Sequence, residues 1–187
     1  MEGEWFSRYK PDFTRVPAIG EEPASLLRDM STNQTELQEN TTDALQDLLT
    51  RAYDAEQGFQ QAAECVESAQ LASLFNEYSA QRREFGGQIK GLMRALHGEP
   101  DKGASIKGKV HQLWIDIRSK ISDGCEQDVL DECLRGEEKA IEDYQDYLND
   151  SSLHPEAHTL ISKQLGEIRD IFGRLKHLER VEDRKSA

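Results

Sequence analysis

The chain lacks several features that would place it in a common functional class. It has no apolar run near the roughly 20 residues that a membrane-spanning helix needs. Its 23 basic residues are outnumbered by 36 acidic residues, which gives a formal net charge of −13. Because phosphate groups repel such a surface, we expect a protein that binds neither duplex nucleic acid nor a membrane.

The start of the sequence also lacks the basic and apolar regions of a secretory signal peptide, because residues 1–5 are acidic. Only three cysteines occur, and Cys65, Cys125 and Cys133 do not have the spacing of a metal site. An odd number of cysteines without a signal peptide fits a reducing compartment. We therefore expect a cytoplasmic protein whose cysteines are small buried side chains rather than redox groups.

Strand-type alternation is missing as well, and helical patterns take its place. A hydrophobic share of 36% beside a charged share of 32% is typical of helices with narrow apolar stripes. Apolar residues recur every three or four positions over four long segments. The pattern predicts long helices over residues 42–67, 70–97, 126–149 and 155–181.

The long link between the second and third of these helices carries a pattern of its own. One face of a shorter helix is lined by Ile106, Val110, Leu113, Trp114, Ile117 and Ile121. Short loops within each helix pair and a long crossover between the pairs are the ferritin-like arrangement. We therefore expect an all-α, ferritin-like four-helix bundle with a short extra helix in the crossover connection. An up-and-down bundle with an added helix is the alternative.

The beginning of the chain differs from the remainder, because three of its five prolines fall within the first 23 residues. Prolines at such short intervals interrupt helices. Aromatic residues also gather there without a clear period. We predict a partly mobile N-terminal extension over residues 1–40, a bundle over residues 41–182 and a disordered C-terminus over residues 183–187.

Charged residues interrupt three of the apolar stripes. Glu56, Arg82 and Glu137 each take a position at which the helical period calls for a core residue. A buried charge is costly unless it is paired or binds a metal. Three such positions on three helices predict one shared polar layer.

Three motifs support a family resemblance. The first is the run over residues 54–64, and the second begins at residues 98–100 and continues through His111 and Trp114. The third combines Glu132, Glu137 and Tyr144. Together, over about residues 42–178, they resemble a bacterial ferritin-like domain family of unknown function that is related to rubrerythrin. The resemblance implies a cytosolic four-helix bundle and no established reaction.

The same resemblance puts metal binding in question. Such families often carry a histidine on the last helix near the position of Phe172, so a ligand there would be lost. A di-iron bundle also needs two Glu-x-x-His pairs, and none of the five histidines belongs to such a pair. Hard carboxylate ligands suit iron or manganese. An all-carboxylate site would use Glu56, Glu84, Glu137 and Glu167.

Helix-pair geometry gives a different interpretation of the same residues. If each pair is antiparallel, Glu56 lies opposite Arg82, and Glu137 lies opposite Gln164 or Glu167. A guanidinium offers five donors and a permanent charge, so Arg82 could bridge both carboxylates and disfavour a second cation. We interpret Glu56, Arg82, Glu137 and Gln164 as a structural polar layer that needs no cofactor.

The functional prediction follows from this layer. We expect a non-enzymatic bundle protein that associates with itself, with a dimer as the first expectation. The alternative is a di-iron or di-manganese carboxylate protein with oxidase, peroxidase or iron-handling activity.

Overall fold

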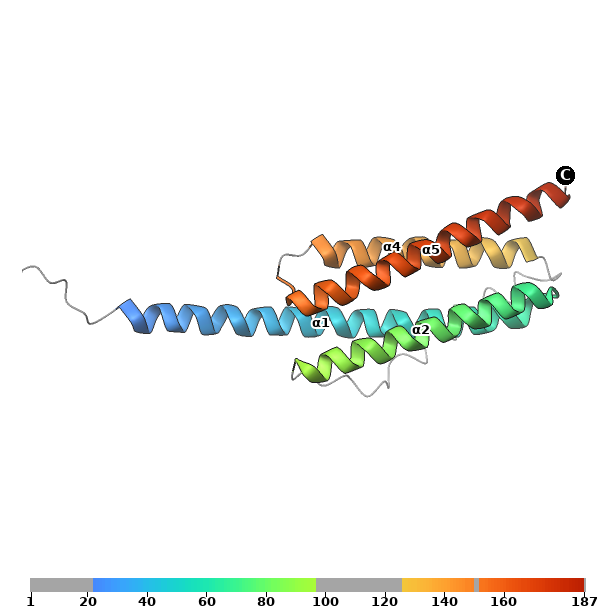
Figure 1. The fold of residues 1–187 in the computed structure, drawn as a ribbon. Coiled ribbons are helices and arrows are strands. Elements are labelled where there is room, and N and C mark those ends of the chain that lie inside the picture. The colour runs from blue at the N-terminus through green and yellow to red at the C-terminus, as the bar shows by residue number, and fades with distance from the viewer. Residues whose placement is uncertain (1–21, 97–125, 150–151, 187) are drawn as a thin grey trace, which may run out of the picture. The chain divides into compact units, whose positions relative to one another are not determined.

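A computed structural model describes residues 22–96, 126–149 and 152–186, with side chains described over residues 32–96, 126–149 and 152–181. The chain divides into two compact units at Thr35, and the packing below concerns the unit that begins at Glu36. The described elements are the helices α1 (Glu22–Cys65), α2 (Ala69–Ala95), α4 (Glu126–Asn149) and α5 (Pro155–Ser186) (Figure 1). Across the described ranges no strand is present, which confirms the predicted all-α bundle.

Two tight turns join the helices into pairs. At the first turn the Ser68 hydroxyl accepts a hydrogen bond from the Leu71 amide at 3.3 Å and caps α2. The Ser68 amide donates to Glu126 Oε1 at 2.6 Å, which ties this turn to the start of α4. At the second turn α5 begins at Pro155, where a proline costs no helical hydrogen bond. The sequence placed both turns correctly.

Two helices are longer than the sequence indicates. α1 begins at Glu22, about twenty residues before the expected start near residue 42. Pro23 reads as a helix breaker in the sequence, yet it lies in the first turn of α1, where its missing amide has no intrahelical partner to lose. α5 continues to Ser186, through most of the expected disordered C-terminus over residues 183–187. Residues 1–21 of the predicted extension and the expected crossover helix lie outside the described residues.

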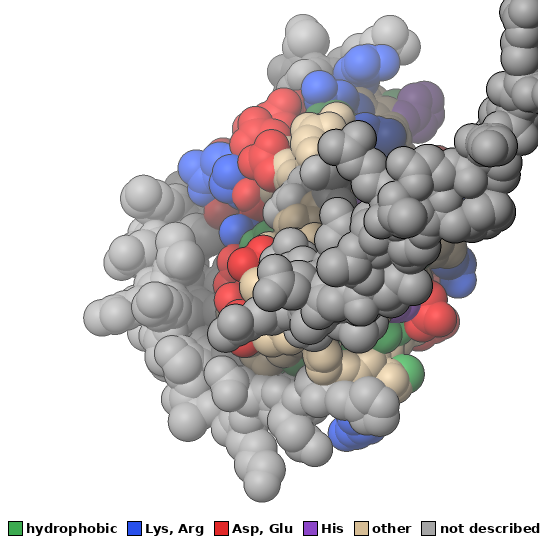
Figure 2. Space-filling view, turned by 90° about the vertical axis from the view of Figure 1, so that its left-hand side faces the viewer, with side chains coloured by type: hydrophobic (Ala, Val, Ile, Leu, Met, Phe, Trp, Pro, Cys, Tyr) green, Lys and Arg blue, Asp and Glu red, His purple; other side chains and the backbone are tan. Residues whose placement is uncertain are grey.

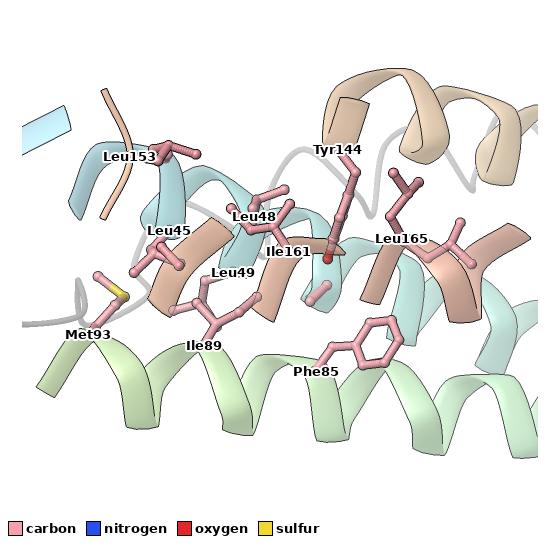
Figure 3. Close-up of a cluster of buried hydrophobic side chains, with 14 residues drawn as sticks. Leu45, Leu48, Leu49, Phe85, Ile89, Met93, Tyr144, Leu153, Ile161 and Leu165 are labelled. Atoms are coloured by element: carbon pink, nitrogen blue, oxygen red, sulfur yellow. The ribbon is translucent and has the colours of Figure 1, made fainter. Parts of the chain in front are cut away.

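The hydrophobic core consists of two separate clusters. The first core cluster includes Leu45 and Leu49 of α1, Ile89 of α2 and Ile161 of α5, which converge in Figure 3. The second core cluster, nearer the turn between α1 and α2, is Phe59, Ala62, Leu71, Phe75, Tyr78, Val129, Leu130, Cys133, Leu134, Ile171 and Leu175. Each fully buried large side chain stabilises the fold by about 1.5–3 kcal/mol.

The apolar stripe is interrupted between the two clusters on three of the four described helices. The break falls between residues 52 and 59 on α1, 78 and 85 on α2, and 134 and 144 on α4, whereas Ile168 and Ile171 of α5 are only one helical turn apart. The charged positions singled out in the sequence lie within this break. The outer surface is also highly charged, and Figure 2 shows acidic and basic side chains next to one another on one face. Among the helices described, none is long and apolar enough to cross a bilayer.

Candidate functional site

Arg82 and Glu137 form a salt bridge at the break between the two core clusters. The Nη2 group of Arg82 on α2 donates to Oε2 of Glu137 on α4, and each side chain is only 2% exposed. The guanidinium carbon lies 5.9 Å from the ring centre of Phe59 and 5.1 Å from that of Phe85. Each ring comes from a different core cluster, so cation–π contacts hold the charge between them.

Burial and pairing act on the carboxylate in opposite directions. Burial raises the pKa of Glu137, and the adjacent Arg82 guanidinium opposes that rise. The Nε atom of Arg82 is buried and has no hydrogen-bond partner among the residues that the structure describes. Glu137 is therefore the main compensation for the charge of Arg82, and loss of either partner would leave an uncompensated buried charge.

Glu56 has a different partner from the one expected. Its Oε1 accepts a hydrogen bond from Nε of Arg83 at 2.7 Å, and its side chain is 16% exposed. Arg82 was expected to bridge Glu56 and Glu137. In the structure it pairs with Glu137, and Glu56 pairs with Arg83 instead. Consecutive helical residues point about 100° apart, so Arg82 enters the core while Arg83 reaches the edge of α1. The Ser79 hydroxyl also donates to the Glu56 carbonyl at 2.9 Å.

Gln164 forms a separate, uncharged network. The Tyr144 hydroxyl donates to Gln164 Oε1 at 3.0 Å. Gln164 Nε2 donates to Gln88 Oε1 at 3.0 Å and to the Phe85 carbonyl at 3.5 Å. The network joins α2, α4 and α5 on the side of the first core cluster, and burial raises the pKa of Tyr144 to about 12. The sequence did not identify Tyr144 and Gln88 as partners, although a buried tyrosine or glutamine side chain requires one.

Glu84 and Glu167 lie apart from Glu137. Glu84 is exposed on α2, where it accepts a hydrogen bond from Gln88 Nε2 at 3.0 Å. Glu167 on α5 accepts from Gln81 Nε2 at 2.9 Å. The two carboxylates therefore have partners of their own on the outer parts of the helices.

The chemistry of these donors does not fit a di-iron or di-manganese centre. Glu56 and Glu137 are each neutralised by an arginine, whereas Glu84 and Glu167 are bound by glutamine side chains. Within the described ranges, no group of three His, Cys, Asp or Glu side chains has an arrangement that could hold a metal ion. Each of the four predicted ligands therefore has a side-chain partner of its own in the structure.

A groove of about 320 Å³ between α1 and α4 reaches the charged layer and was not predicted. It is lined by Glu137 and by small residues such as Gly58, Gly136 and Ala140. Asp54 lies in the same groove, and its buried Oδ1 has no hydrogen-bond partner in the described part of the chain. Burial raises the pKa of Asp54 to about 6, and Arg51 opposes that rise. Small residues leave no periodic signal in a sequence, which is why the pattern did not reveal this groove.

The comparison with protein families gives a match over much of the chain. The family described as "Domain of unknown function (DUF2383)" matches residues 40–150, which is more than half of the 187 residues. The matched part contains Glu56, Arg82 and Glu137, whereas Gln164 and Glu167 on α5 lie beyond it. No curated protein shows a significant match to the chain. The chain therefore belongs to the DUF2383 family.

Proposed function

We propose that this protein is a non-enzymatic, self-associating bundle, related to ferritin-like and rubrerythrin-type proteins, in which an Arg–Glu pair takes the place of metal ligands. The observation that carries the proposal is the buried salt bridge between Arg82 and Glu137. A guanidinium is always charged, so a divalent ion beside Glu137 would meet a fixed repelling charge in a poorly solvated layer.

In this proposal the pair has a structural role. Arg82 and Glu137 lie between the two core clusters, on helices that belong to different helix pairs. A slip of one helix along the other would bury two unpaired charges, which costs several kcal/mol. We infer that the pair fixes the register of the bundle, so that its outer faces form stable surfaces for binding.

Metal loading tests the absence of a metal centre. The full chain is incubated anaerobically with Fe²⁺ or Mn²⁺, separated from free metal and analysed for bound metal. We expect no stoichiometric iron or manganese. One or two ions per chain in the wild type that disappear in Glu56→Gln would instead support the alternative di-iron or di-manganese protein. Glu138→Gln is the matched control, because Glu138 is an exposed neighbour of the buried Glu137.

Light scattering tests the self-association. The chain has a mass of 21.3 kDa, so a dimer would have about twice that mass in solution. A monomer mass across the whole accessible concentration range would contradict this part of the proposal. Metal loading and light scattering can fail separately, since one concerns the charged layer and the other the outer surface.

A further inference from the structure

A second groove, which the proposed function does not use, lies between α2 and α5. Its volume is about 720 Å³, within the range of small-molecule sites. It is lined by Leu74, Tyr78, Arg169, Asp170, Gly173, Arg174, His177 and Leu178. The first two residues belong to α2 and the others to α5, near the second core cluster.

An unsatisfied hydroxyl lies in this groove. The Tyr78 side chain is 4% exposed, and its buried Oη atom has no partner at full hydrogen-bond geometry among the described residues. The Arg174 guanidinium lies beside the phenol and interacts with it through its charge and a weak hydrogen bond, which leaves the hydroxyl able to bind a ligand oxygen. Burial raises the pKa of Tyr78 and Arg174 opposes that rise, so the phenol keeps its proton at neutral pH. A buried hydroxyl of this kind is rare unless a partner is missing from the site.

The groove also carries positive charge that other described residues do not neutralise. Arg169 and Arg174 form no ion pair within the described part of the chain. Two guanidinium groups and the imidazole of His177 line the groove, against the single carboxylate of Asp170 among the described lining residues. In a chain with a net charge of −13, such a site would attract an anion.

One of the lining residues is a glycine, Gly173 of α5. A Cβ atom built on Gly173 would meet no atom within 4 Å. Leu74 of α2 and Leu178 of α5 offer apolar surface near the donor groups. The site therefore combines hydrogen-bond donors for an anionic group with space and apolar contacts for a carbon skeleton.

We propose that this groove binds a small organic oxyanion, with a phosphate or carboxylate group on an apolar body. The Tyr78 hydroxyl and the Arg174 guanidinium donate hydrogen bonds to the anionic oxygens, and Arg169 adds favourable charge. Leu74 and Leu178 contact the apolar part of the ligand. This inference concerns a different face from the charged layer and does not depend on the proposed function.

Titration of the full chain with phenyl phosphate and with benzoate tests the site, with binding followed by calorimetry and by backbone amide NMR shifts. We expect saturable binding of at least one probe, with shifts on α2 near Tyr78 and on α5 near Gly173. Inorganic phosphate should bind more weakly, because it lacks the apolar body. Equal binding of inorganic phosphate would overturn the apolar part of the proposal, and no saturable binding of either organic probe would overturn all of it.

Substitutions connect binding to particular atoms. Tyr78→Phe keeps the ring and removes the donor, so it should weaken binding about fivefold. Arg174→Gln should weaken binding about tenfold, because a charge-assisted hydrogen bond is lost. Gly173→Leu should weaken binding strongly, because it adds a side chain to the lining of the groove, while a leucine is compatible with the helix.

Arg94→Gln is the control, because Arg94 is an exposed arginine at the opposite end of α2. It should leave binding unchanged. If Gly173→Leu and Arg94→Gln had the same affinity as the wild type, the groove would not be the binding site. Circular dichroism of each variant confirms that a loss of binding is not a loss of fold.

Discussion

Arg82 and Glu137 meet across two helices at the level where the hydrophobic core is interrupted, and each side chain is only 2% exposed. The charged pair therefore contacts both halves of the core without belonging to either. Its contribution to stability depends on both members being present, because each compensates the burial of the other. This dependence leads to the first prediction.

Arg82→Met should destabilise the protein by about 3–5 kcal/mol, because it leaves the carboxylate of Glu137 buried without its partner. The double variant Arg82→Met/Glu137→Leu should recover most of that loss, since it replaces both charges with apolar groups. Urea unfolding of the wild type and the two variants measures the difference. A double variant as unstable as Arg82→Met would show that the pair is not an independent unit.

The same single variant should show a defined pH dependence. Burial raises the pKa of Glu137, and Arg82→Met removes the charge that opposes this rise. A carboxyl with a raised pKa binds its proton more tightly in the folded state than in the unfolded state. The stability deficit of Arg82→Met should therefore shrink as the pH falls toward the unfolded pKa of a glutamate. A deficit that does not change between neutral and acidic pH would contradict this account.

Arg83→Gln should have a much smaller effect than a substitution of its neighbour Arg82. Arg83 is 62% exposed, and its partner Glu56 lies at the edge of the core. Exposed salt bridges contribute about 0–1 kcal/mol, so unfolding of Arg83→Gln in urea should shift little from the wild type. A loss comparable to that of Arg82→Met would mean that Glu56 belongs to the buried layer after all.

Asp54→Asn should stabilise the protein at neutral pH but not at acidic pH. The pKa of Asp54 is raised from 3.8 to about 6, so the folded state binds the proton more tightly between these values. Stability of the wild type is thus lost as the pH rises through this window, and the variant avoids the loss. After a discount for solvent that reaches this half-buried group, the expected gain at pH 7 is about 1 kcal/mol.

Unfolding of Asp54→Asn and of the wild type in urea, at pH 4 and at pH 7, measures this difference. Asp146→Asn is a suitable reference, because it removes an exposed carboxylate from the neighbouring helix α4. The explanation fails if the gain in Asp54→Asn is as large at pH 4 as at pH 7.

Two tyrosines should differ in their response to loss of the hydroxyl. Tyr144→Phe leaves Oε1 of the fully buried Gln164 without its donor, so it should cost about 1–2 kcal/mol. Tyr78→Phe removes a hydroxyl that has no partner at full hydrogen-bond geometry among the described residues, so without ligand it should change the free energy of unfolding by less than about 0.5 kcal/mol. Thermal unfolding of both variants compares them directly, and equal losses would contradict the assignment of partners.

The periodicity of the sequence predicted much of the fold. The bounds expected for α4, residues 126–149, agree with the structure, because the helical period continues on both sides of Glu137. The stripes also placed Arg82 and Glu137 at core positions, and both are buried. The start of α1 could not be predicted, because Pro23 has different effects in the first turn of a helix and in its interior.

The partner of a side chain was harder to predict than its position along the axis of the bundle. Helix-pair geometry placed Glu56 opposite Arg82, yet Glu56 pairs with the next residue, Arg83. That choice depends on side-chain direction, which changes by about 100° from one residue to the next. The bond from Tyr144 to Gln164 joins two helices through long side chains, and helix level alone does not specify such partners.

The separation of the two core clusters has a consequence for motion. Because the charged layer interrupts the apolar stripe at one level of α1, α2 and α4, each end of the bundle has its own cooperative packing. Local opening of one end can leave the other end folded. We expect amide hydrogen exchange to show two protection levels along α2, with the change between them near Arg82, so that a single continuous helix belongs to two foldons.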